Sequence, residues 1–123
     1  MIVGIGTDII EIQRIKKACA KEAFFMRCFT ERERNLIGDN YSRAAGNFAV
    51  KEAVSKVFGT GIRGFELLDI EVLRDDLGKP FVNLYNKAAM VAEKNRISKI
   101  HISISNTKEY AIAYAIGESN VNV

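Results

Sequence analysis

The stretch 69-DIEVLRDDLGKPFVNLY-85 decides the fold, because two runs rich in β-branched and aromatic residues flank the sequence DDLGKP. Gly78 and Pro80 beside paired aspartates are typical of a turn, so residues 69–74 and 81–85 are predicted to form a β-hairpin. The strands of a hairpin are antiparallel and need no helix between them. The stretch therefore argues against a doubly wound parallel sheet, in which helices alternate regularly with strands.

Three helices are predicted before the hairpin and one after it. Residues 9–28 carry Ile12, Ile15 and Cys19 at helical spacing, with lysines between them. Thr30-Glu31-Arg32-Glu33 is a capping box, which marks the start of a second helix. A third helix is predicted over residues 40–58 and a fourth over residues 87–95.

Strands open and close the predicted domain. Residues 2–7 are short, apolar and β-branched, and are predicted to form a buried strand that ends at Asp8. Residues 100–105 alternate isoleucine with polar residues, as in a half-buried strand, and residues 110–116 form the last strand. The order β-ααα-ββ-α-ββ predicts an α+β fold with a mainly antiparallel sheet and helices packed against it. One domain is expected over residues 1–117, followed by a polar, frayed tail over residues 118–123.

Composition limits the class of protein. The 123 residues are 48% hydrophobic with a net charge of +3, which suits one folded domain and argues against disorder. No apolar stretch approaches a membrane span, and no basic segment of a signal peptide follows Met1. The only two cysteines, Cys19 and Cys28, form no metal or redox motif and are expected to be reduced thiols in a cytoplasmic protein.

Asp8, Glu52 and Lys56 are the main candidates for chemistry. Glu52 and Lys56 lie four residues apart and share a helix face, which by itself is often only a surface ion pair. If Asp8 lies beside them, two carboxylates and water supply the oxygen ligands that Mg²⁺ prefers. Lys56 would then neutralise phosphate oxygens that the metal does not reach.

Two further groups of residues are weaker candidates for anion binding. Gly59, Gly61 and Gly64 match G-x-G-x-x-G, but they close a helix and precede a strand, so a dinucleotide-binding fingerprint is rejected. They form either a helix cap or a turn whose N–H groups approach an anion. Ser105, Asn106 and Thr107 follow a polar strand edge and offer donors for a phosphate, whereas the single histidine, His101, is interpreted as structural.

Positive charge is concentrated in the first half of the chain. Residues 1–63 carry 11 Lys and Arg against 7 Asp and Glu. Such an excess is either an ordinary solvated surface or suits an anionic partner. Four basic residues on or near the first predicted helix form a candidate docking surface for an acidic partner: Arg14, Lys17, Lys21 and Arg27.

Six motifs together resemble one family. They are 4-GIGTDIIEI-12, 48-FAVKEA-53 with Ser55 and Lys56, 58-FGTGI-62, 69-DIEV-72 with 78-GKP-80, 101-HISIS-105 and 108-KEYA-111. In this order and at this length the chain resembles the holo-[acyl-carrier-protein] synthases, the small bacterial 4′-phosphopantetheinyl transferases. The resemblance implies the fold of that family and spans nearly the whole chain.

The resemblance also implies an activity. The 4′-phosphopantetheine arm of coenzyme A moves to a serine of apo acyl carrier protein, which leaves adenosine 3′,5′-bisphosphate and serves fatty acid biosynthesis. Asp8 and Glu52 match the metal-binding carboxylates, Lys56 the lysine near the pyrophosphate, and Arg14 the arginine that contacts the acidic carrier. The family further implies Mg²⁺ dependence and a homotrimer with active sites between subunits.

Three departures from the family bear on binding. Asn47 and Asn106 stand where relatives have arginine and histidine near the phosphates of coenzyme A, and Ala18 stands where a larger apolar residue faces the carrier. Losing an arginine removes a bidentate phosphate donor, so either coenzyme A is bound more weakly or another residue such as Lys51 or Arg63 compensates. Lys51 therefore joins Lys56, Gly59, Gly61, Ser105, Asn106 and Thr107 as an expected coenzyme A contact.

Two other classes of function remain open at the level of sequence. A non-catalytic module that binds coenzyme A or a nucleotide would share the basic half and the glycine loop. A small nucleic-acid-binding protein is supported only by the sequence pI of about 8.9.

Overall fold

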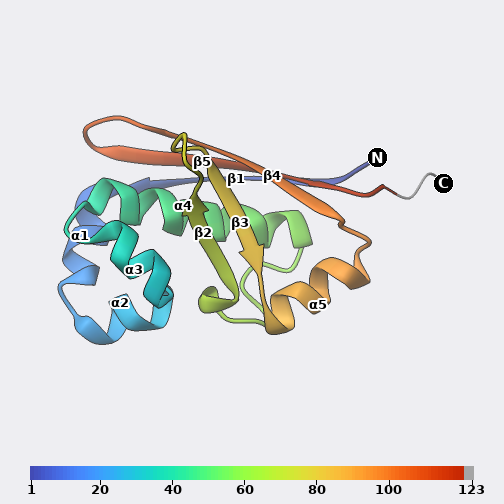
Figure 1. Cartoon of the computed structure of the whole chain (residues 1–123), viewed down its shortest axis with the longest axis horizontal. Helices are drawn as coiled ribbons and strands as arrows, with labels where there is room; N and C mark the ends of the chain where they lie inside the picture. Colours follow the sequence, from blue (N-terminus) through green and yellow to red (C-terminus); the bar gives the residue numbers. More distant parts are fainter. Residues whose placement is uncertain (121–123) are drawn as a thin grey trace.

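A computed structural model describes residues 1–120 of the chain (Figure 1). A three-stranded antiparallel sheet has the order β1-β5-β4, with β1 at Ile2–Glu11, β4 at Lys99–Asn106 and β5 at Tyr110–Glu118. The long helix α4, Tyr41–Phe58, lies along one face of this sheet. The β-hairpin forms a separate two-stranded sheet of β2, Ile70–Arg74, and β3, Pro80–Leu84. The prediction of an α+β fold with antiparallel pairing is confirmed.

The remaining helices lie at the two ends of α4. Three short helices gather at its N-terminal end: α1 at Ile12–Cys19, α2 at Glu22–Cys28 and α3 at Glu31–Ile37. A 3₁₀ helix, η1, at Leu67–Asp69 and α5 at Asn86–Lys94 lie near the hairpin. The capping box at α3 is confirmed, because the Thr30 side chain accepts from Glu33 N and the Glu33 side chain accepts from Thr30 N. Within residues 1–120 no helix is both long and apolar enough to cross a membrane.

The first predicted helix is wrong in two respects. Residues 9–11 continue β1, and the rest is broken into α1 and α2 because Lys21 adopts an extended backbone conformation. The break folds the chain back, so that Cys19 and Cys28 reach one hydrophobic cluster with Phe29 and Ile37. An unbroken helix of this length would extend about 30 Å and could not bury all of these positions in one small core.

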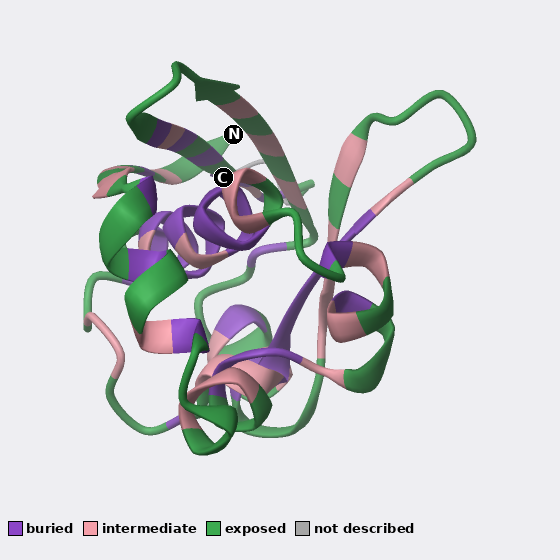
Figure 2. Cartoon of the chain, turned by 90° about the vertical axis from the view of Figure 1, so that its left-hand side faces the viewer, coloured by how far each residue is buried: buried purple, intermediate pink, exposed green. Residues whose placement is uncertain are grey.

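The prediction that residues 2–7 form a buried strand is wrong. Strand β1 lies at an edge of the sheet and only one of its faces meets α4, so that Ile5 is 70% exposed and Ile9 58% exposed. Exposed and buried residues alternate along strands of this sheet (Figure 2). The expected fraying of the tail does not include residues 118–120, because Ser119 N donates to Met1 O over 2.8 Å and Asn120 N donates to Ser98 Oγ over 3.1 Å. The rest of that tail lies outside the described residues.

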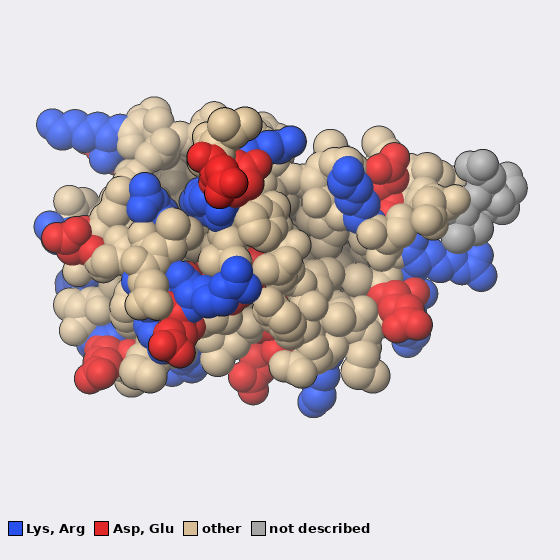
Figure 3. Space-filling model, in the orientation of Figure 1, with Lys and Arg blue, Asp and Glu red and all other residues tan. Residues whose placement is uncertain are grey.

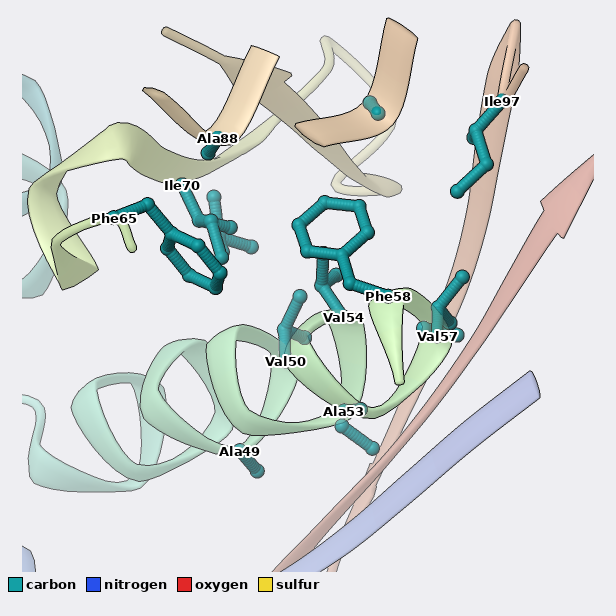
Figure 4. Close-up of a cluster of buried hydrophobic side chains, with 14 residues drawn as sticks. Ala49, Val50, Ala53, Val54, Val57, Phe58, Phe65, Ile70, Ala88 and Ile97 are labelled. Carbon is teal, nitrogen blue, oxygen red and sulfur yellow. The ribbon is translucent and has the colours of Figure 1, made fainter. Parts of the chain in front are cut away.

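Helix α4 is packed on both sides. Toward the hairpin, its valines and Phe58 meet Phe65 and Ile70 in a hydrophobic core (Figure 4). Toward the sheet, it lies on Gly4, Gly6 and Gly117. A Cβ atom at Gly6 would lie 1.9 Å from the Ala53 carbonyl oxygen, and one at Gly4 would lie 2.7 Å from that of Val57. The helix backbone therefore rests directly on the strand backbone, and only glycine allows this approach.

A buried ion pair holds the other side of α4. Lys51 Nζ lies 2.8 Å from Glu33 Oε1 of α3, and both side chains are fully buried. The ammonium also donates to the backbone carbonyls of Leu67 and Ile70. Asn47 Nδ2 completes the network by donating to Glu33 Oε2 over 3.1 Å and to Val72 O over 2.9 Å. This Glu33–Lys51 network therefore joins α3, α4 and β2.

We predict that Gly6→Ala lowers the free energy of unfolding by at least about 2 kcal/mol, because the added methyl group collides with helix backbone that cannot rotate away. Urea denaturation measures this loss. Lys94→Ala, at the exposed end of α5, is the control and should change stability by under about 0.5 kcal/mol. Equal stability of the two variants would contradict the close packing.

We predict that Lys51→Met costs about 3–5 kcal/mol of unfolding free energy, because it leaves the Glu33 carboxylate buried without its cation. The double variant Glu33→Gln with Lys51→Met should recover part of the loss, because no charge then remains buried. Thermal and urea unfolding of the three proteins test this. A double variant less stable than Lys51→Met would show that the buried charge is not the cause.

Candidate functional site

Asp8, Glu52 and Lys56 meet where β1 crosses α4. Asp8 follows Gly6 by two residues, so its side chain is on the same face of the strand, toward the helix. Lys56 Nζ lies 3.5 Å from Asp8 Oδ1 and donates to Thr7 O over 2.7 Å. Glu52 lies one turn before Lys56 on α4. The close contact of Gly4 and Gly6 with the α4 backbone thus brings the three predicted residues together as a trio.

The two carboxylates of the trio repel each other. Burial raises the pKa of Asp8, and the Lys56 ammonium partly opposes this effect. Burial also raises the pKa of Glu52, and the nearby Asp8 charge raises it further. A cation placed between the carboxylates would relieve both effects.

The geometry of Asp8 fits a bound cation. Its Oδ2 is buried and has no hydrogen-bond partner, although a buried carboxylate oxygen normally has one. Residues 1–120 hold no cluster of three or more His, Cys, Asp or Glu side chains that would enclose a metal. Asp8 and Glu52 would therefore share a hard cation such as Mg²⁺ with water and phosphate oxygens, which is how this ion is usually bound.

The glycine loop adjoins the trio through the end of α4. Gly59 caps the helix in the left-handed conformation, with φ of 78°, and Gly61 has φ of 64°. Gly59 N donates to Lys56 O, so the loop begins within one turn of the lysine. No other atom lies within 4 Å of a Cβ placed at either glycine, which leaves the loop backbone open to a ligand.

Ser105, Asn106 and Thr107 lie at the opposite edge of the sheet. Asp8 pairs with Ala113 of β5, and Ala113 pairs with Ile104 of β4, so two strand spacings, about 10 Å, separate Asp8 from the start of this group. Helix α4 fills the space between the two edges. A single chain therefore does not bring all the predicted coenzyme A contacts together.

A polar hollow surrounds Asn106. It has a volume of about 320 Å³ and lies between the start of α4, the end of β4 and the hairpin. Its lining includes Ser42, Arg43, Arg74 and Asn106, whose amide donates to Ser42 Oγ. The sequence analysis missed both arginines, because residues 43 and 74 meet only through the tertiary packing of the hairpin on α4.

Lys51 is wrong as a coenzyme A contact. Its ammonium is enclosed in the Glu33–Lys51 network and does not reach the surface. Asn47 is likewise fully buried and is directed to Glu33 and Val72. Sequence spacing did not reveal this, because Lys51 and Glu52 are neighbours whose side chains leave the helix about 100° apart and so face different surroundings. Arg63 remains exposed next to the glycine loop.

The predicted docking residues are all exposed on α1, α2 and the turn that joins them: Arg14, Lys17, Lys21 and Arg27. Figure 3 shows several basic side chains over this helical end of the molecule, interspersed with acidic ones. Beside them lies an apolar groove of about 370 Å³, lined by Arg14, Ile15, Ala18, Phe24 and Phe48. The groove continues to Ile9, Ile10 and Glu11 of β1.

Comparison with known proteins shows the family and the fold of the chain. Residues 4–115 match the model of the 4′-phosphopantetheinyl transferase superfamily. The chain is 54% identical to the holo-[acyl-carrier-protein] synthase of Lachnoclostridium phytofermentans over 118 residues, which cover 96% of this chain and 97% of the relative.

Two crystal structures of holo-[acyl-carrier-protein] synthases share the fold. The Neisseria meningitidis protein superposes with a TM-score of 0.88 at 34% identity, covering 97% of this chain and 100% of that one. The Bacillus anthracis protein, in complex with coenzyme A (3′,5′-ADP), has a TM-score of 0.82 at 42% identity, covering 98% and 99%. By its sequence and by the fold that carries Asp8, Glu52 and Lys56, the chain belongs to the 4′-phosphopantetheinyl transferase superfamily.

Proposed function

We propose that this protein transfers 4′-phosphopantetheine from coenzyme A to a serine of apo acyl carrier protein, and that it requires Mg²⁺. The observation that carries the proposal is Asp8, whose buried Oδ2 has no partner beside Glu52 and Lys56. The name of the 54% identical relative and the coenzyme A complex of the Bacillus anthracis protein support the acceptor and the donor.

The residues of the trio divide the work of the transfer. The serine oxygen attacks the phosphorus on the pantetheine side of the pyrophosphate. A new O–P bond forms, the bond from that phosphorus to the bridging oxygen breaks, and adenosine 3′,5′-bisphosphate leaves. Lys56 stabilises the charge on the leaving oxygens. We assign the serine proton to Glu52, because Asp8 is already paired with Lys56. Mg²⁺ on Asp8 and Glu52 would supply further neutralisation of the pyrophosphate.

The basic end of the molecule is the proposed carrier-docking surface. Exposed cations steer an acidic partner, and the apolar groove beside Arg14 offers a contact that salt does not screen. Because this groove reaches Ile9 and Ile10, which follow Asp8 in β1, a carrier helix seated there would lie at the same strand as the trio.

A trimer with sites between subunits is proposed to complete the active site. The outward face of the three-stranded sheet exposes Ile5, Ile9, Tyr114 and Ile116, which in a lone chain would leave an apolar surface in water. The Asp8 edge and the Asn106 edge of one chain lie on opposite sides of α4. A second copy that packs on this face would place the Asn106 edge of one chain opposite the Asp8 edge of the next.

The transfer and its metal requirement are tested together by intact-mass spectrometry of apo carrier after incubation with coenzyme A, Mg²⁺ and the protein. We expect a mass gain of one phosphopantetheine, abolished by EDTA. Asp8→Asn and Glu52→Gln should each slow the transfer by at least about 100-fold and remain folded, whereas the exposed Glu93→Gln should have no effect. Coenzyme A binding without transfer to any of several carriers would favour the non-catalytic binding module.

The shared site predicts complementation between two inactive variants. Asp8→Asn damages one edge, and Asn106→Glu places a carboxylate at the other. Refolding an equal mixture should restore activity, because about a quarter of the sites in random trimers combine two intact edges. The control mixture of Asp8→Asn with Glu52→Gln damages the same edge twice and should stay inactive. Mixed assemblies without recovered activity would show that each chain carries a complete site.

The docking surface predicts a variant that is impaired toward the carrier alone. Arg14→Ala should raise the KM for the carrier about three- to tenfold and leave the KM for coenzyme A unchanged, because it removes one steering charge. Lys94→Ala, at the exposed end of α5, is the matched control. In steady-state kinetics of the wild type, rising salt should raise the KM for the carrier, because salt screens the docking charges. Carrier affinity that does not depend on salt would exclude electrostatic docking.

A further inference from the structure

The Lys56 ammonium already holds the place of a cation at the trio. Its Nζ lies 3.5 Å from Asp8 Oδ1 and donates to Thr7 O over 2.7 Å. Glu52 lies one turn earlier on the same face of α4, so the ammonium lies near both carboxylates. A divalent cation bound to Asp8 would repel this ammonium, and the two therefore compete for one carboxylate.

The base of the Lys56 side chain is fixed, whereas its tip is free to move. A Cβ atom at Gly6 would lie 3.0 Å from Lys56 Cβ, so the base of the side chain packs against the strand backbone. The side chain of Lys56 is nevertheless 52% exposed, whereas that of Asp8 is only 17% exposed. Because the ammonium sits on a flexible four-carbon stem, it can leave Asp8 without any movement of α4 or β1.

The contacts of the Lys56 ammonium are weak enough to be exchanged. Its 3.5 Å separation from Asp8 Oδ1 is longer than a charge-assisted hydrogen bond. Ion pairs with a half-exposed lysine contribute little to stability, because water competes for both partners. The hydrogen bond to Thr7 O is also exposed, so water can replace the ammonium there.

The donor offers Lys56 a second partner. The proposed function, on which this inference rests, places the pyrophosphate of coenzyme A beside the trio. The open glycine loop begins within one turn of Lys56, so a phosphate bound there would lie next to the same side chain. A pyrophosphate carries more negative charge than a carboxylate that is shared with a metal, and it is then the better partner for the ammonium.

We propose that Lys56 exchanges partners on binding: it pairs with Asp8 in the free protein and moves to the phosphate oxygens when a divalent cation and coenzyme A are bound. Lys56 thereby weakens metal binding without the donor and strengthens it with the donor. Because such coupling is reciprocal, the metal also tightens the binding of coenzyme A. Asp8 is paired in both states, first with Lys56 and then with the cation, so the serine proton stays assigned to Glu52.

The first test measures the binding of Mn²⁺, which takes the same oxygen ligands as Mg²⁺, from the EPR signal of the free ion. Without donor, Lys56→Met should bind Mn²⁺ about three- to tenfold more tightly than the wild type, although its transfer is slower. Lys56→Arg should bind the metal no more tightly than the wild type, because an arginine still pairs with Asp8. Lys94→Met removes an equal charge from α5 and should behave as the wild type.

The second test adds coenzyme A without carrier, so that nothing is transferred. After correction for the metal that coenzyme A binds by itself, the donor should tighten Mn²⁺ binding to the wild type by about tenfold or more. The effect on Lys56→Met should be much smaller. NMR of the lysine ammonium groups, with the Lys56 signal assigned from Lys56→Arg, should show this signal move when Mg²⁺ is added.

The outcomes separate this inference from the proposed function. Binding of Mn²⁺ to Lys56→Met that is as weak as to the wild type, or a Lys56 signal that Mg²⁺ does not move, would overturn the exchange and leave the transfer intact. Asp8→Asn should lose Mn²⁺ binding. If it binds the metal as the wild type does, the carboxylate site of the proposed function is wrong, and the exchange with it. Thermal unfolding shows that each variant is folded.

Discussion

The contact between α4 and the backbone of β1 and β5 is the constraint on which the rest of the molecule depends. Gly4 and Gly6 leave no side chain between α4 and β1, so the helix lies at a distance set by backbone atoms, and Gly117 leaves room on β5 for the Val57 side chain. The alanines of β5 that face α4 extend the same small-residue surface. Because Asp8 follows on the same strand face, its position relative to Glu52 and Lys56 is determined by this contact and not by flexible side chains.

The opposite side of α4 depends on polar burial. The Glu33–Lys51 network satisfies two charges and the three carbonyl groups of Leu67, Ile70 and Val72, all in a fully buried place. Such pairs contribute little net stability compared with apolar packing, but they tolerate very few alternative arrangements. The network therefore fixes the rotation of α4 about its axis, while the glycines fix its height above the sheet. Together they direct Glu52 toward Asp8 at the β1 edge of the sheet.

Local signals in the sequence predicted much of this structure. The hairpin turn, the capping box at Thr30 and the isoleucine alternation of β4 each depend on neighbouring residues, and each was confirmed. The break between α1 and α2 was missed because neither Ala20 nor Lys21 is a helix-breaking residue. The bend there is favoured by tertiary packing, since it brings α1 and α2 into one hydrophobic cluster around Phe29. Lys51 was misplaced for a related reason, since a lysine beside a functional glutamate gives no sign of a buried carboxylate eighteen residues away.

The arrangement of the site at two edges of one sheet has a genetic consequence. In the proposed trimer each chain contributes its Asp8 edge to one site and its Asn106 edge to another. A chain with a defect at a single edge would then disable one site and leave its neighbours' other sites intact. Two defective alleles with lesions at different edges would restore the transfer together where neither does alone. An allele that replaces Gly4 or Gly6 would instead lose the whole chain, and the other allele would not be restored by it.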